Sequence, residues 1–178
     1  PTGTGILLIK KSIAEHMEPL IGGGAQVSNV TDNKVEYWDV PLKLEAGTPN
    51  IAGVIGTGAS IDFMQNIGMD VIHNHTQHLL EIIIKELRER KIPIICDDLP
   101  IEQRGGLVSF TIPGQHSYDV SVALGLRDIY VRSGKLCAHP VVNKLSDTGF
   151  IRASVGINNN EVDVARFLEA LDQVLNYG

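Results

Sequence analysis

The segment DIYVRSGKLCAHPVVNKLSDTGFIRASVGI, residues 128–157, predicts two β-strands joined by a loop that carries a cysteine. Residues 128–132 and 148–157 alternate apolar with other side chains, which is typical of half-buried strands. In the first strand Ile129 and Val131 share one face, and in the second strand Ile151, Ala153 and Val155 do so. Gly134 ends the first strand, so we expect Cys137 on a loop held by a sheet, where nucleophiles often occur.

The flanking sequence predicts the rest of this sheet and the helices that cover it. Short strands are expected at 94–96 and 107–112, a helix at 117–126, and a final helix from Asn160. The last helix carries an apolar stripe of Val164, Phe167, Leu168, Leu171, Val174 and Leu175. Residues 92–178 therefore predict an α+β fold, a mostly antiparallel sheet covered by helices.

The first part of the chain shows less regular hydrophobic periodicity than residues 92–178. Residues 5–10 predict a buried strand, and residues 21–50, rich in Gly, Asn and Pro, predict a long irregular stretch. A Gly-rich helix is expected from Asn50 and a broadly apolar helix at 70–90. We therefore expect residues 1–65 to form a separate piece.

The composition excludes several classes of protein. The chain has 178 residues, 43% of them hydrophobic, with a formal net charge of −6 and two cysteines far apart. An acidic chain without a Lys/Arg-rich block argues against nucleic acid as a partner. Its apolar runs are too short to predict a membrane span, and two distant cysteines suit a reducing cytoplasm.

The loop cysteine has cationic neighbours. Arg132 and Lys135 are close to Cys137 in sequence and would favour its thiolate, the nucleophilic form. Arg152 lies in the middle of the next strand, where its guanidinium would face solvent or bind a carboxylate through two parallel hydrogen bonds. A loop cysteine without a function and a surface arginine remain the alternatives at this point.

Three other features are weaker. Thr48, before the Gly-rich helix, could belong to an anion site suited to phosphate, although a turn or cap role is the more common explanation. Cys96 ends an apolar run and predicts a small core residue. A cluster of histidines at 73, 75 and 78 has no acidic or cysteine partner, so no metal site is expected.

Five motifs in order carry a family resemblance. They are PTGTG at 1–5, GGG at 22–24, EAGTPN at 45–50, RSGKLCAHP at 132–140 and RAS at 152–154. The set resembles the C-terminal part of class V enzymes that depend on pyridoxal phosphate (PLP), most closely the group II cysteine desulfurases of the SufS and selenocysteine-lyase type. The resemblance covers essentially the whole chain.

The resemblance implies a reaction and roles for residues. L-Cysteine would become L-alanine, with a persulfide left on Cys137; Arg152, helped by Arg132, would hold the substrate. Thr48 would reach the PLP phosphate of a partner subunit, near Gly23 and Gly24 at the interface of a homodimer. The sulfur would pass to an acceptor or scaffold protein of iron–sulfur cluster assembly.

The resemblance also implies a fragment of a fold-type I PLP-dependent transferase. Residues 1–65 would be the tail end of the large PLP-binding domain, and residues 66–178 the small C-terminal domain. The lysine that binds PLP as a Schiff base would lie just upstream of Pro1, so the fragment alone is expected to be inactive.

The nucleophile motif departs from the family pattern. Lys135 and Leu136 stand where two histidines are usual, and His139 follows Ala138. These changes affect proton transfer near Cys137, where His139 could replace the two missing histidines. They also affect whether cysteine or selenocysteine is the preferred substrate. The alternatives are a selenocysteine lyase, another class V aminotransferase or epimerase, or a module without catalysis that serves dimerisation or sulfur carriage.

Overall fold

The computed structural model describes residues 2–176, which divide into two compact units. The first unit runs to Asn66 and the second begins at Ile67. Within the described residues, no helix combines the length and the apolar character needed to cross a membrane.

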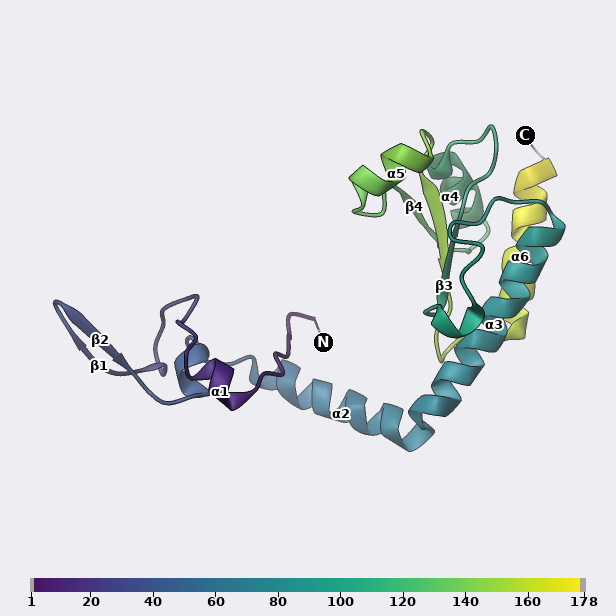
Figure 1. The fold of residues 1–178 in the computed structure, drawn as a ribbon. Helices are drawn as coiled ribbons and strands as arrows, with labels where there is room; N and C mark the ends of the chain where they lie inside the picture. Colours follow the sequence, from purple (N-terminus) through teal and green to yellow (C-terminus); the bar gives the residue numbers. More distant parts are fainter. Residues whose placement is uncertain (1, 177–178) are drawn as a thin grey trace. The chain divides into compact units, whose positions relative to one another are not determined.

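An antiparallel sheet forms the centre of the second unit (Figure 1). Its strands are β3 (Leu107–Phe110), β4 (Arg132–Gly134) and β5 (Phe150–Ser154), in the spatial order β3-β5-β4. The prediction of an antiparallel sheet is confirmed. Residues on β5 alternate between the two faces, because successive side chains of a strand point to opposite sides.

Helices cover one face of this sheet. They are α3 (Met69–Glu89), α4 (Ser117–Gly125) and α6 (Glu161–Asn176); α5 (His139–Leu145) and the 3-10 helix η2 (Ile101–Gln103) connect other elements. The predicted apolar stripes of α3 and α6 are buried, and they pack with the sheet around Phe110 and Ile151, both 0% exposed. The opposite face of the sheet carries Ser109, Arg132 and Arg152.

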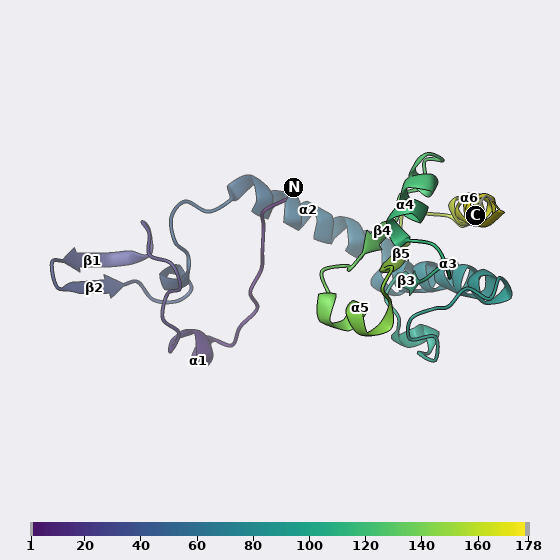
Figure 2. The same cartoon turned by 90° about the horizontal axis from the view of Figure 1, so that it is seen from above.

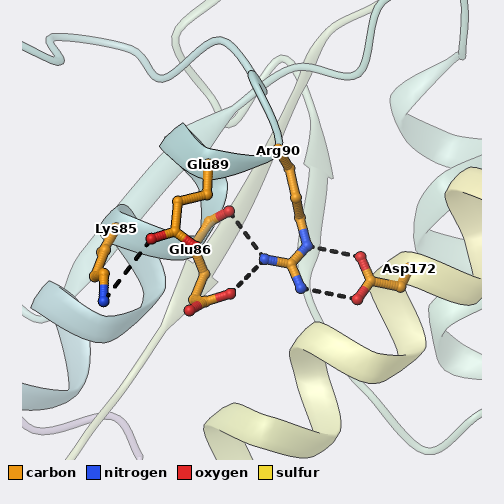
Figure 3. A network of polar contacts seen from close by, with 5 residues as sticks. All are labelled: Lys85, Glu86, Glu89, Arg90 and Asp172. Atoms are coloured by element: carbon orange, nitrogen blue, oxygen red, sulfur yellow. Dashed lines mark hydrogen bonds and ion pairs between the residues drawn. The ribbon is translucent and has the colours of Figure 1, made fainter.

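A cluster of charged groups joins α3 to α6 (Figure 3). The Arg90 guanidinium donates two hydrogen bonds to the Asp172 carboxylate, at 2.6 and 2.8 Å, and a third to Glu86 at 2.6 Å. The hydrogen bonds to Asp172 and Glu86 raise the pKa of Arg90. The hydrogen bond from Arg90 lowers the pKa of Asp172, so this ion pair is charged at neutral pH.

The first unit contains a hairpin and one long helix. Its elements are α1 (Lys11–Ala14), β1 (Val27–Thr31), β2 (Lys34–Tyr37), the 3-10 helix η1 (Leu42–Leu44) and α2 (Ile51–Ile67). The strands β1 and β2 pair antiparallel, as Figure 2 shows. Gln26, just before β1, is completely buried, and its side chain is hydrogen-bonded, as buried amide groups usually are.

Two predictions for the first unit are wrong. Residues 5–10 form no strand, and Leu8 is 97% exposed. The reason is that no other described residue pairs with this segment, and a strand exists only when its backbone finds a partner. The stretch 21–50 is not wholly irregular, because it contains the hairpin; its two-residue turn Asp32-Asn33 lacks the glycine by which such turns are recognised in a sequence.

Three predictions for the second unit need correction. Ile94 makes only an isolated bridge to Phe110, and Cys96 is exposed with a φ of 54°, so Cys96 is not a core residue. The strand expected at 128–132 lies instead at 132–134, because residues 128 and 129 close the end of α4 through hydrogen bonds to Gly125 and Leu124. The short helix α5 was not predicted.

Candidate functional site

The site in the second unit is built around the turn that carries Cys137. The Ala138 amide donates to the Lys135 carbonyl at 2.8 Å, which closes a turn with Leu136 and Cys137 at its centre. The Cys137 thiol is exposed, and the Arg132 Nη2 lies 3.1 Å from its Sγ. The structure therefore brings together the predicted nucleophile and one of its two predicted cations, through a hydrogen bond from the guanidinium to the sulfur.

Arg152 lies directly opposite Arg132 on the neighbouring strand. Ser109 is the partner of Arg152 on the other side, so a row of three residues crosses the sheet. The Arg152 Nε is buried without a hydrogen-bond partner among the described residues. A buried guanidinium N–H that lacks an acceptor costs free energy, so this geometry suits an anion that would bind there.

The pair of guanidinium groups has no countercharge in the described part of the chain. Neither Arg132 nor Arg152 forms an ion pair with a carboxylate of residues 2–176. Like charges placed opposite each other on adjacent strands destabilise a sheet. A carboxylate held by these groups would relieve the repulsion, and the Cys137 thiol would be beside it.

The turn formed by residues 135–138, called the nucleophile turn below, is hydrogen-bonded to the loop that precedes β5. The Lys135 ammonium donates to the Ser146 carbonyl at 3.4 Å, so it points to this loop. A Cβ on Gly149 would lie 2.9 Å from the Gly134 Cα, which shows how closely the two backbones approach. The Ser146 hydroxyl donates to the Gly149 carbonyl at 3.1 Å. The sequence did not identify Ser146 or Gly149 as supporting residues.

His139 is the first residue of α5, two positions after Cys137, and its side chain is exposed. No hydrogen bond of its ring is found among the described residues, so the exposed ring can contact a ligand or water. The structure thus brings Cys137, Arg132 and Arg152 together, whereas His139 is linked to them only by its place in the sequence.

The first unit brings its glycine-rich motifs together. The Gly47 amide donates to the Gly24 carbonyl at 2.8 Å. A Cβ on Gly23 would lie 3.0 Å from the Gly47 nitrogen, so a larger residue would require the Gly47 backbone to shift. Thr48 follows and is exposed. The Gly23 and Gly47 amides are already hydrogen-bonded within the chain, so the exposed Thr48 hydroxyl is the group that this arrangement offers to a phosphate.

The cap of α2 is Asn50, not Thr48. The Asn50 Oδ1 accepts from the Gly53 amide at 3.0 Å, and its Nδ2 donates to Thr4 Oγ1 at 3.2 Å. A Cβ on Gly53 would collide with the Thr4 hydroxyl and the Asn50 amide. Asn50 therefore joins Thr4 to the start of the helix, and no hydrogen bond of the Thr48 side chain is found within residues 2–176.

Gln26 is a supporting residue that sequence reasoning missed. Its Oε1 accepts from the Gly23 amide at 2.8 Å, and its Nε2 donates to the carbonyls of Lys43 and Ile21 at 2.7 and 3.1 Å. The side chain thereby positions the glycine segment against residues 43–47. Nothing in the sequence around Gln26 signals this role, because its partners are backbone groups.

The histidine cluster has structural partners. The His75 ring contacts the Asn159 carbonyl at 2.8 Å, and the His78 ring contacts the Glu161 carboxylate at 2.7 Å. In the part of the chain that the structure describes, no three His, Cys, Asp or Glu residues gather as metal ligands would.

Known proteins are similar to this chain over nearly its full length. The profile of the aminotransferase class-V family matches residues 1–167. A protein of Xylella fastidiosa named "Probable cysteine desulfurase" is 36% identical over 174 residues, which are 98% of this chain and 41% of that protein. A protein of Streptomyces coelicolor with the same name is 34% identical over 99% of this chain and 42% of its own length.

Solved structures agree with this relationship. The apo structure of a cysteine desulfurase from Thermococcus onnurineus NA1 superposes with a TM-score of 0.89 at 32% identity, over 96% of this chain and 42% of that chain. The cysteine desulfurase CsdA of Escherichia coli gives a TM-score of 0.85 at 30% identity, over 94% of this chain and 41% of that chain. The chain spans about two fifths of the length of these relatives, and it belongs to the aminotransferase class-V family.

Proposed function

We propose that this chain is the C-terminal part of a PLP-dependent cysteine desulfurase of group II. The observation that carries the proposal is the group of Cys137, Arg132 and Arg152. The Cys137 Sγ lies 3.1 Å from the Arg132 guanidinium, and Arg152 lies opposite Arg132 on β5. A thiol that contacts one guanidinium, with a second on the neighbouring strand and no carboxylate of residues 2–176 paired to either, suits a substrate that carries a carboxylate and a sulfur atom.

In this proposal Arg152 binds the carboxylate of L-cysteine through its guanidinium fork. Arg132 stabilises the thiolate of Cys137, which attacks the substrate sulfur. A sulfur–sulfur bond forms and the substrate carbon–sulfur bond breaks. The atoms balance: L-cysteine and the Cys137 thiol give L-alanine and a persulfide on Cys137.

Thr48, Gly23 and Gly24 would hold the phosphate of PLP, in the contact expected across a homodimer. When bound, PLP supplies the electron sink that makes the substrate carbon–sulfur bond labile. None of the lysines of this chain matches the family's Schiff-base position, so that lysine would come from a preceding part of a longer polypeptide. The glycine segment, which Gln26 positions, explains how a small phosphate group could approach the backbone.

His139 is proposed to transfer protons at the mouth of the site, in place of the histidines that Lys135 and Leu136 replace. The proposal rests on its exposed ring two residues from Cys137. A His139→Ala protein should change the pH dependence of kcat while keeping the Cys137 persulfide. An unchanged pH–rate profile would remove His139 from the reaction.

The remaining parts of the proposal concern partners and location. The persulfide would pass to an acceptor or scaffold protein of iron–sulfur cluster assembly in the cytoplasm. An exposed Cys137 is compatible with this, because a second protein must reach the persulfide. Direct sulfur transfer from the labelled persulfide to a purified candidate acceptor would test the idea.

The decisive experiment measures alanine formed from L-cysteine by the full-length protein with PLP, beside its Cys137→Ser variant. Cys96→Ser is the matched control, because Cys96 is the other exposed cysteine of the chain. We expect alanine from the parent and from Cys96→Ser, and none from Cys137→Ser. Alanine from Cys137→Ser at the parental rate would contradict the role of Cys137, and none from the parent would contradict the desulfurase itself.

A further inference from the structure

The backbone of the nucleophile turn lies in the left-handed region at two consecutive residues. Leu136 has a φ of 51° and Cys137 a φ of 59°, and Gly134 two residues earlier has a φ of 94°. Among the described residues, this is the one place where two consecutive residues other than glycine have positive φ. Positive φ at both central residues defines a type I′ turn, in which Asn and Gly are preferred and Leu is not.

The surrounding structure holds this disfavoured conformation on both sides. Before the turn, Gly134 is paired with Phe150 in the sheet. After the turn, the Ala138 carbonyl accepts from the Val142 amide at 3.0 Å, in the first turn of α5. Strained backbone persists only when its surroundings determine it, and it gathers at functional sites.

We propose that Leu136 is a positioning residue that acts through its backbone. Its left-handed conformation reverses the chain within the turn, and this reversal aims the Cys137 Sγ at the Arg132 guanidinium, 3.1 Å away. A right-handed or extended residue 136 would give a type I or type II turn, which can keep the hydrogen bond from Ala138 to Lys135 but sends the chain on a different course around Cys137. The inference rests on the proposed function for the importance of Cys137, but its geometry does not require that function.

One consequence separates the backbone from the side chain of Leu136. The contact between Cys137 and Arg132 should follow the ease with which residue 136 adopts positive φ, not its size or hydrophobicity. Gly and Asn adopt that conformation readily, whereas β-branched Val does so only at a high cost. Leu136→Asn and Leu136→Gly should therefore keep the contact, and Leu136→Val should lose it.

Charge-selective alkylation measures the contact without substrate or PLP. In a Cys96→Ser background, the ratio of alkylation rates for iodoacetate and iodoacetamide reports cations near the Cys137 thiolate. A unit charge about 6 Å from the anionic reagent in water changes this ratio about 3-fold. Arg132→Gln sets the value expected when the contact is lost, and Leu136→Val should match it.

Lys91 offers a matched control, since it has a φ of 56° at the end of α3, far along the chain from Cys137. Lys91→Val imposes the same kind of backbone cost and should leave the ratio unchanged, which separates positioning from loss of stability. A ratio that falls equally in the Asn, Gly and Val variants of Leu136 would overturn the inference and assign the effect to the leucine side chain. A ratio unchanged in Leu136→Val would overturn it as well.

The two proposals can fail separately. If the ratios follow the handedness of residue 136 but the full-length protein forms no alanine, the positioning role stands and the desulfurase proposal fails. If alanine forms but the ratios are the same in all Leu136 variants, the desulfurase proposal stands and the positioning role fails.

Discussion

Arg132 and Arg152 are direct cross-strand neighbours on β4 and β5, and neither is neutralised by a carboxylate of the described residues. Two like charges in this arrangement oppose folding. Proteins accept such a cost where ligand binding requires it. The pair therefore makes separate predictions for stability and for activity.

Removing one charge should stabilise the fold while it weakens the reaction. Arg132→Gln is expected to raise the free energy of unfolding by about 0.2–1 kcal/mol, the usual range for a cross-strand charge pair. Urea denaturation without substrate measures this change, and alanine formation measures the loss of activity. Arg166→Gln, at an exposed position of α6, should change neither quantity. Destabilisation by Arg132→Gln would contradict the account of the charge pair.

Arg152→Lys should retain the charge but lose the bidentate geometry. A charge-assisted hydrogen bond contributes about 1.5–3 kcal/mol, so we expect kcat/KM for L-cysteine to fall roughly 10- to 100-fold. Steady-state kinetics of alanine formation by the full-length protein test this. An unchanged kcat/KM would mean that Arg152 does not bind the substrate carboxylate.

Gly149→Ala should disturb the nucleophile turn through packing. A Cβ there would lie 2.6 Å from Ser117 Oγ and 2.9 Å from the Gly134 Cα, at a residue with a φ of 80°. We expect destabilisation of about 1–3 kcal/mol, because the Gly134 backbone cannot move aside freely. Gly125→Ala is the control, since nothing lies within 4 Å of its Cβ position. Thermal unfolding of both variants decides the question, and equal stabilities would refute the argument.

Asp172→Asn should destabilise the protein in a pH-dependent way. The pKa of Asp172 is lowered in the folded protein, chiefly by the hydrogen bond from Arg90, so its contribution is present above the unfolded pKa of about 4 and is lost as the pH falls below it. Because the Asp172 side chain is 46% exposed, screening limits the effect to about 1 kcal/mol at pH 7. Urea denaturation at pH 7 and near pH 3 should show the difference shrinking in acid. Glu89→Gln, in the exposed pair with Lys85, should show little effect at either pH.

Gln26→Met should loosen the glycine segment of the first unit. It removes three hydrogen bonds and leaves the partly buried Gly23 amide and two carbonyls without their partner, at a cost of about 1–3 kcal/mol. We expect weaker PLP retention by the full-length protein, measured by the absorbance of bound cofactor after dialysis. Gln65→Met, at an exposed position of α2, is the control and should retain PLP. Equal retention would show that Gln26 does not support the cofactor site.

Sequence reasoning succeeded where local pattern and burial coincide. The apolar stripes predicted α3 and α6, and the alternation around Ile151 predicted β5, because a side chain on the wrong face of these elements would be exposed. The motifs led to Cys137 and Arg152 as candidate site residues. Their roles remain predictions that the experiments above address.

Other features depended on information that local sequence does not contain. Ile129 and Val131 alternate like a strand, yet the Ile129 amide donates to the Leu124 carbonyl and completes the end of α4, so pairing starts at Arg132. The opposition of Arg132 and Arg152 follows from strand register, which is set by packing and turns. The left-handed backbone of Leu136 runs against the preference of leucine, so no propensity argument could anticipate it.

The uneven distribution of buried apolar side chains has a consequence for exchange with solvent. Nearly all of them lie between Leu79 and Val174, and in the described part of the first unit only Ala14 is among them. Amide hydrogens are protected longest where opening requires the whole core to unfold, and briefly where small local fluctuations suffice. A deuterium-labelling time course of this 178-residue chain should therefore show two populations of amides, with a fast phase from residues before Asn66 and a slow phase from the sheet and its helices.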